Sequence, residues 1–122
     1  PNIKAIIMTA SVSAHNGAEF PEYCASKGGV LAYTKNVALR VAKYGATCNS
    51  ISAGGVITEL NAHILENKSL WDQVMAETLI PKWATVEEMA EWTYFLAVVN
   101  KSMTAQDVLI DNGEIAKANF VW

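Results

Sequence analysis

Residues 3–51 read IKAIIMTASVSAHNGAEFPEYCASKGGVLAYTKNVALRVAKYGATCNSI, and this stretch decides the fold. It begins with a short apolar run over 3–9 that shows little alternation, which is typical of a strand buried on both faces of a parallel sheet. A loop of small and polar residues follows over 11–19. A long helix then begins at Pro21 and Glu22, because proline fits the first helical turn and the helix dipole favours a glutamate there.

This helix is predicted to extend to about residue 43, where Gly45 supplies the usual left-handed cap. Its apolar positions recur at spacings of three and four, which indicates one broad apolar face. The positions on this apolar face are Val30, Leu31, Thr34, Val37, Ala38, Val41 and Ala42. A second short strand is predicted over 47–51, and Gly54 and Gly55 after it keep the strand from continuing.

The rest of the chain continues the alternation of helix and strand. Residues 58–75 are ambiguous and predict one or two short helices with a break at 67–69. Thr85 and Glu88 form a capping box that opens a helix to about residue 98, and residues 107–110 predict a last strand. This order predicts an α/β fold with a parallel sheet and helical crossovers. Three strands are too few for a stable doubly wound sheet, so residues 1–122 predict half of such a domain.

The composition bounds the size and the partners. A chain of 122 residues holds one domain at most, and 9 basic against 12 acidic residues give a net charge of −3. That balance excludes the basic footprint needed for nucleic acid or an anionic membrane surface. No apolar run reaches the ~20 residues of a membrane span. Charged residues make up 17%, below the ~25% of an average domain, which predicts faces buried against the rest of the chain or a neighbouring subunit.

The termini and cysteines bear on compartment and completeness. The first ten residues lack the features of a signal peptide, and the sequence begins at Pro1 without an initiator methionine, so we expect a lost upstream segment. Cys24 and Cys48 have no metal spacing and are expected to be reduced thiols of a cytoplasmic protein, although a disulfide between them stays open. No cluster of histidine and acidic residues predicts a metal site.

Tyr23 and Lys27 are the first candidates for chemistry. They are four residues apart on the long helix, so both project from one face. A free phenol has a pKa near ~10, and an ammonium within ~5 Å favours the phenolate. The first strand ends beside the start of this helix, so Ser11 can place a hydroxyl next to the phenol and complete a proton-transfer site. A tyrosine and a lysine at this spacing also occur often by chance.

The wider pattern around these residues resembles the short-chain dehydrogenase/reductase family. Residues 11–58 have a strand ending in serine, a tyrosine 12 residues later, a lysine four further on, an Asn-x-Ile-x-x-Gly turn and a threonine. The resemblance continues through IPKWATVEEMAEW at 80–92 and MTAQDVLIDNG at 103–113. It therefore covers residues 3–113 and implies the C-terminal half of a Rossmann-like, NAD(P)-binding catalytic domain.

The resemblance implies an NAD(P)-dependent oxidoreductase acting on an alcohol or carbonyl. Tyr23 would be the acid/base that exchanges the carbonyl proton. Lys27 would hold the nicotinamide ribose and lower the pKa of Tyr23, and Ser11 would hydrogen-bond the substrate oxygen. Gly54 and the residues after it would lie along the nicotinamide, with Val56 meeting the carboxamide and Thr58 reaching the cofactor. Thr58 could instead be a helix N-cap.

Further residues are expected to contact substrate, each beside a plainer interpretation. Ser13 and His15 follow the catalytic serine, and the histidine could instead be a solvated loop residue. Leu60 and Trp83 fall in the region that forms the substrate lid in this family and could simply be packing residues. Between residues 60 and 92 there is no arginine, so a strongly anionic substrate is not favoured, while a sugar, polyol, steroid or acyl thioester stays open.

The departures from the family pattern concern glycine. Ala105 and Asn112 stand where the closing segment usually has glycine, and Ala53 replaces a proline before Gly54. The seven glycines form no phosphate-binding loop, so the choice between NAD and NADP is expected to lie upstream. The resemblance also implies a missing N-terminal half, in the same or another chain, and a homodimer or homotetramer with the long helix at an interface.

Two other function classes compete with an oxidoreductase. A non-catalytic fragment or interaction module would keep the fold without binding cofactor alone, but it has no physical need for Ser11, Tyr23 and Lys27 together. A lyase or dehalogenase on the same scaffold would usually alter the lysine, which is present here. The absence of the phosphate loop keeps the fragment alternative open.

Overall fold

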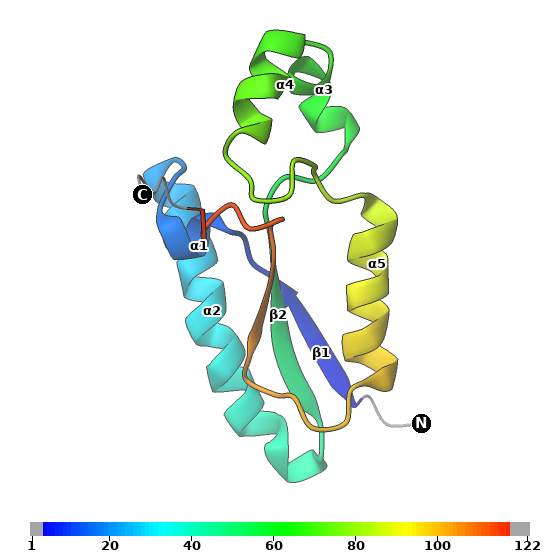
Figure 1. Ribbon diagram of the computed structural model, residues 1–122. Helices are drawn as coiled ribbons and strands as arrows, with labels where there is room; N and C mark the ends of the chain where they lie inside the picture. Colours follow the sequence, from blue (N-terminus) through cyan, green and yellow to red (C-terminus); the bar gives the residue numbers. More distant parts are fainter. Residues whose placement is uncertain (1–3, 118–122) are drawn as a thin grey trace, which may run out of the picture.

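The computed structural model describes residues 4–117, which form one parallel sheet flanked by helices. The strands β1 (Ala5–Thr9), β2 (Thr47–Ala53) and β3 (Asp107–Ile110) lie in the order β1-β2-β3. The long helix α2 (Pro21–Val41) lies on one side of the sheet and α5 (Val86–Tyr94) on the other (Figure 1). The predicted α/β class is therefore confirmed. The shorter helices are α1 (Ser13–Asn16), η1 (Ala42–Tyr44), η2 (Glu59–Asn61), α3 (Ala62–Leu65), α4 (Lys68–Met75) and the π-helical turn η3 (Phe95–Val99).

The parallel register places the ends of the three strands together. Ala5 pairs with Thr47 at the start of β1, and Ala53 pairs with Ile110 at the end of β2. Beyond β1, the amide of Val12 still donates to the carbonyl of Ala53 at 3.0 Å. The chain around Ser11 is thus held at the carboxyl edge of the sheet, the edge where α/β proteins bind their ligands.

The core is centred on β2. Cys48, Ile51 and the polar side chains between and beside them are almost completely buried, and Leu96 of η3 is the largest fully buried side chain. Burial raises the pKa of the Cys48 thiol, and both Cys24 and Cys48 are free thiols. Asn49 lies in this core with its amide satisfied, donating to the Met103 carbonyl at 2.9 Å. Among residues 4–117, no buried side-chain polar atom lacks a partner.

The helices cover the sheet less completely than the sequence pattern predicts. Six of the seven predicted apolar positions lie on α2 and the seventh, Ala42, begins η1; of all seven, Thr34 and Ala38 are buried. Within the described residues, no side chain of α5 is buried, and the α5–η3 segment exposes Trp92, Tyr94, Phe95, Val98 and Val99. A sheet of three strands is too narrow to bury the apolar side chains of both helices. None of the helices within 4–117 combines the length and apolarity of a membrane span.

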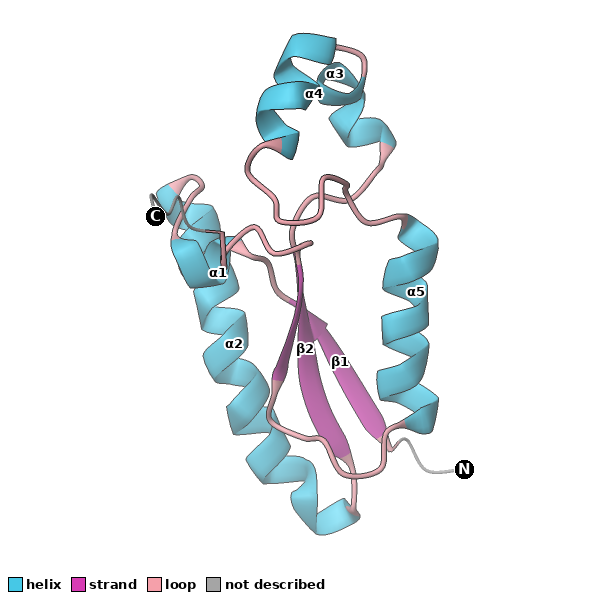
Figure 2. Ribbon diagram, viewed as in Figure 1, coloured by secondary structure: helices cyan, strands magenta, loops and turns pink. Residues whose placement is uncertain are grey.

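The segment after β2 forms a small helical unit beyond the carboxyl ends of the strands, where Figure 2 shows α3 and α4 side by side. The predicted break at 67–69 is shorter than expected, because Asn67 caps α4 by accepting from the Leu70 amide at 3.1 Å. The loop predicted over 11–19 contains the single helical turn α1. Gly45 has the predicted left-handed conformation, with φ 68°.

The predicted capping box opens α5. Thr85 Oγ1 accepts from the Glu88 amide at 3.1 Å, and the Glu88 carboxylate accepts from Lys82 Nζ at 2.8 Å. The hydrogen bond from Lys82, together with its charge and the Thr85 amide, lowers the pKa of Glu88. The hydroxyl half of the box is thus confirmed, and the carboxylate also ties the helix start to the preceding loop.

Ala105 adopts a conformation that favours glycine, with φ 61°. For an alanine this left-handed backbone costs about 1–2 kcal/mol. Glycine avoids that steric cost but loses more conformational entropy on folding, so the net gain in stability is smaller. Ala105→Gly is therefore expected to raise the free energy of unfolding by about 0.5–1 kcal/mol, measured by urea unfolding. Asn112→Gly, at φ 53°, should change stability less because asparagine tolerates this region. An unchanged or lower urea midpoint for Ala105→Gly would contradict the conclusion that the Ala105 backbone is strained.

Candidate active site

The start of α2 and the end of β1 bring Ser11, Tyr23 and Lys27 to one region. Tyr23 lies in the first turn of α2 and is 43% exposed. Lys27 follows one turn later, with Nζ 5.8 Å from the centre of the Tyr23 ring. The same ammonium donates to the carbonyl of Thr9 at 3.0 Å. Ser11 is buried, and its Oγ accepts from the Ser13 amide at 3.2 Å.

A pocket of about 530 Å³ opens at the carboxyl edge of the sheet. Ser11 and Tyr23 both line it, so the predicted hydroxyl pair shares one cavity. Lys27 is not among the side chains that line this pocket; its ammonium is hydrogen-bonded to the end of β1. The lining residues of the sequence-predicted set are Ser11, Ser13, Tyr23, Gly54, Val56, Thr58 and Trp83.

The turn after β2 forms the opposite wall of the pocket. Gly54 packs against the end of β3, where a Cβ would lie 2.9 Å from Asp111 Cα. Thr58 occupies the N-cap position of η2, but its side chain makes no capping hydrogen bond there. Instead, Asn61 Nδ2 donates to the Val56 carbonyl at 2.8 Å and reaches Thr58 Oγ1 at 3.3 Å. Asn61 thus fixes the shape of this turn, a role that the sequence analysis did not assign.

Trp83 closes the pocket from the lid region. Its indole packs edge-on against Trp71, with ring centres 5.4 Å apart, and lies directly over Gly55, where any Cβ would overlap the indole. Trp83 is therefore a packing residue and at the same time a wall of the pocket, so both interpretations from the sequence apply to it. Leu60, in contrast, is 88% exposed and does not line the pocket.

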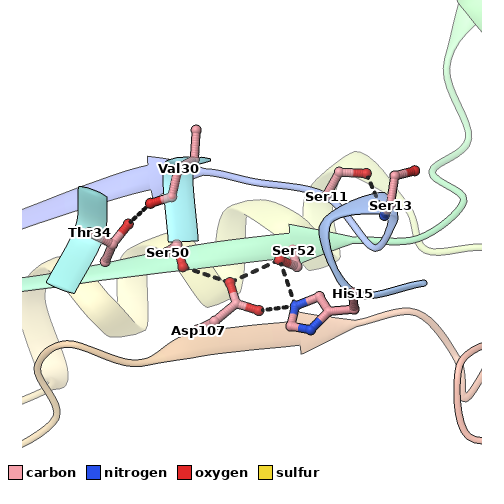
Figure 3. A network of polar contacts seen from close by, with 8 residues as sticks. All are labelled: Ser11, Ser13, His15, Val30, Thr34, Ser50, Ser52 and Asp107. Atoms are coloured by element: carbon pink, nitrogen blue, oxygen red, sulfur yellow. Dashed lines mark hydrogen bonds and ion pairs between the residues drawn. The ribbon is translucent and has the colours of Figure 1, made fainter. Parts of the chain in front are cut away.

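His15 also lies outside the pocket, contrary to the expectation of a substrate contact. Figure 3 shows its ring turned toward β3, where Nε2 lies 2.7 Å from Asp107 Oδ2. The short turn α1 directs Ser13 inward and His15 toward the neighbouring strand. No signal in the sequence pointed to this pairing, because the two residues are 92 positions apart.

Four polar residues of the lining were not predicted, namely Asn16, Glu19, Asn61 and Glu114. The pKa of Glu114 is raised, first by its burial and then by the carboxylates of Glu77 and Asp111. No lysine or arginine lines this pocket in the described part of the chain. Nor do residues 4–117 group three histidine, cysteine or acidic side chains in a way that could hold a metal ion.

Comparison with known proteins bears on the family and the fold. The model of a family described as enoyl-(acyl carrier protein) reductase matches residues 2–114. An L-rhamnose 1-dehydrogenase (NADP(+)) from Thermoplasma acidophilum is 28% identical over 110 residues, covering 88% of this chain and 43% of that protein. A 3-oxoacyl-[acyl-carrier-protein] reductase from Chlamydia pneumoniae is 31% identical over 112 residues, covering 89% and 44%.

The solved structures match in fold as well. A gluconate 5-dehydrogenase from Burkholderia cenocepacia, in complex with NADP and tartrate, superimposes with a TM-score of 0.84 at 27% identity, covering 93% of this chain and 46% of that one. The chain thus spans less than half the length of these relatives. The three strands and their helices correspond to part of a Rossmann-like fold. The chain belongs to the short-chain dehydrogenase/reductase family.

Proposed function

We propose that the protein is an NAD(P)-dependent oxidoreductase that interconverts an alcohol and a carbonyl, with Tyr23 as its acid/base. One observation carries this proposal: the Ser11 hydroxyl and the Tyr23 phenol line the same pocket as the Gly54–Thr58 turn. A proton donor, a second hydroxyl and a site for a flat ring are what such a reaction requires of a protein. Family membership supports the same reaction class.

Each side chain has a distinct task in this proposal. The Ser11 hydroxyl donates to the substrate oxygen and stabilises charge developing on it. The Tyr23 hydroxyl passes a proton to that oxygen in the reducing direction and takes it back in the oxidising direction. The Lys27 ammonium, near the Tyr23 ring, stabilises negative charge on the phenol oxygen by Coulomb attraction.

The residues of the pocket fit the nicotinamide end of a dinucleotide, which supplies or accepts the hydride when it is bound. Gly54 and Gly55 let a ligand approach the backbone closely, and Val56 and Thr58 line the same wall. The Lys27 ammonium has three N–H donors, and one of them donates to the Thr9 carbonyl. The other donors can therefore bind ribose hydroxyls. The lining residues do not discriminate between NAD and NADP.

We further propose that an N-terminal half, in the same or another chain, supplies the phosphate site. The sequence has no phosphate-binding glycine loop. β1 lies at an edge of the sheet, and parallel strands are normally covered on both faces and paired on both sides. The exposed apolar side chains of α5 and η3, including Trp92 and Phe95, lie where such a half would pack.

Self-association is the remaining part of the proposal. The outer face of α2 exposes the large apolar side chains Tyr33 and Leu39, which favours a neighbouring subunit on this helix. Sedimentation of the natural polypeptide that carries this sequence is expected to show a dimer or tetramer. A monomer at micromolar concentration would contradict this part alone.

The reaction itself is tested by following nicotinamide absorbance. The natural polypeptide is incubated with NAD or NADP and a panel of sugars, polyols, steroid alcohols and 3-hydroxyacyl thioesters, and in reverse with the reduced cofactors and carbonyls. We expect turnover with a neutral substrate, because no cation lines the described pocket. A folded protein that binds neither dinucleotide and turns over none of the panel would overturn the proposal in favour of a non-catalytic module.

A further inference from the structure

A polar cluster, buried at Ser50 and Ser52 and open to solvent at His15, links the turn that follows Ser11 to the last strand of the sheet. At its centre is Asp107, the first residue of β3. Its Oδ1 accepts from Ser50 Oγ at 2.6 Å and from Ser52 Oγ at 2.9 Å, and its Oδ2 lies 2.7 Å from His15 Nε2 (Figure 3). His15 Nε2 also lies 3.3 Å from Ser52 Oγ, so the cluster joins α1 to β3 through the carboxylate and to β2 through Ser52.

The cluster is shielded from solvent at its serine end, whereas the His15 side chain is 30% exposed. Ser50 and Ser52 are 1% and 0% exposed, and the Asp107 side chain is 16% exposed. An ionised carboxylate only accepts hydrogen bonds, so Nε2 of His15 carries the proton and donates to it. Three donors on one carboxylate, two of them from buried serines, fix the position in which Asp107 receives His15. Hydrogen bonds to a charged acceptor are also the stronger kind.

The turn α1 gains a second anchor from this cluster, in addition to the bond from the Val12 amide to the Ala53 carbonyl. It has four residues, and an isolated helical turn of this length is unstable because nucleation costs more than its few hydrogen bonds return. Its first residue is Ser13, whose amide holds the Ser11 hydroxyl and whose side chain lines the pocket. His15 is two residues further on. An interaction that holds His15 in place therefore also holds the backbone that orients the Ser11 hydroxyl.

We propose that Asp107 and His15 are positioning residues, which hold α1 against the sheet and thereby keep Ser11 and Ser13 aimed into the pocket. The proposal rests on the proposed function for its catalytic consequence. The histidine itself touches no pocket atom in this arrangement. Its contribution is to place the serine hydroxyl, and small misplacements of a catalytic group lower the rate strongly.

The test uses His15→Ala, Asp107→Ala, the double variant and Asp107→Asn in the natural polypeptide. We expect both alanine variants to lower kcat by about 10-fold to 100-fold with the dinucleotide Kd unchanged, since the Gly54–Thr58 wall is untouched. The double variant should be no worse than the more impaired single one, because both remove the same link. Asp107→Asn should stay within about 3-fold of wild type, because its amide can accept from the serines and donate to the other His15 tautomer.

A control and a second readout separate the possible outcomes. His63→Ala removes an exposed histidine and should leave kcat unchanged. Hydrogen exchange of the amides of residues 13–17 should accelerate in His15→Ala but not in His63→Ala, a result that requires no activity. Unchanged kcat and unchanged exchange in folded His15→Ala would overturn the positioning role of His15 and Asp107. A wild-type protein without any nicotinamide-linked turnover would instead overturn the proposed function. Faster exchange in His15→Ala would then still support the positioning role.

Discussion

Tyr23→Phe in the natural polypeptide is expected to reduce kcat by about 10³-fold, because it removes the single oxygen that exchanges the proton with substrate. The folded state should be nearly unaffected. Tyr23 is 43% exposed, and in the described part of the chain its hydroxyl makes no side-chain hydrogen bond whose loss would destabilise α2. Steady-state turnover, dinucleotide Kd and melting temperature measured on the same sample separate these effects.

The matched control is Tyr33→Phe, which removes the same atom from the same helix at a position 59% exposed and outside the pocket. Its kcat should equal that of wild type. A Tyr23→Phe protein that keeps more than about a tenth of the wild-type kcat would show that another group moves the proton, since general acid–base groups contribute at least ~10²-fold. Ser11 would then be the next hydroxyl to replace.

Gly55→Ala is expected to disrupt both folding and the pocket. A Cβ at this position would overlap the Trp83 indole, which is itself packed on Trp71. Relieving the overlap must move the indole or the turn, and overpacking of this kind typically costs about 1–3 kcal/mol. We expect a lower urea midpoint, a changed tryptophan emission spectrum and a higher KM for substrate, because Trp83 is a wall of the pocket.

Gly29→Ala provides the control for the change from glycine to alanine. It lies on the exposed side of α2, and nothing lies within 4 Å of an added Cβ. A helical glycine replaced by alanine should stabilise the protein by about 0.5–1 kcal/mol. If Gly55→Ala behaved like Gly29→Ala, the close contact between the turn and Trp83 would be wrong.

Local patterns predicted those parts of the fold that local physics determines. The first strand, the long helix with Gly45 at its end, and the Thr85 cap follow from apolar periodicity and capping rules. The placement of Ser11 and Tyr23 at one pocket follows from the geometry of a strand, a short loop and a helix. These features depend on residues that are close in the sequence.

The features that sequence analysis missed depend on distant contacts. His15 seemed close enough to Ser11 to meet a substrate, but Asp107, far along the chain, draws its ring to the opposite side. Asn61 and Glu114 line the pocket because the turn after β2 and the end of β3 converge there. Leu60 is apolar and lies in the lid region, yet α3 and α4 leave it exposed.

The bond between His15 and Asp107 is expected to form late in synthesis. The ribosome releases a chain from its N-terminus, so Ser11, Tyr23 and Lys27 emerge long before Asp107, which lies 92 positions after its histidine partner. Until that last strand is translated and docks, the serine turn lacks this second anchor and is held to the sheet through the bond of Val12 to Ala53. A nascent or truncated polypeptide that ends before residue 107 would therefore carry every proposed catalytic side chain and still be catalytically immature.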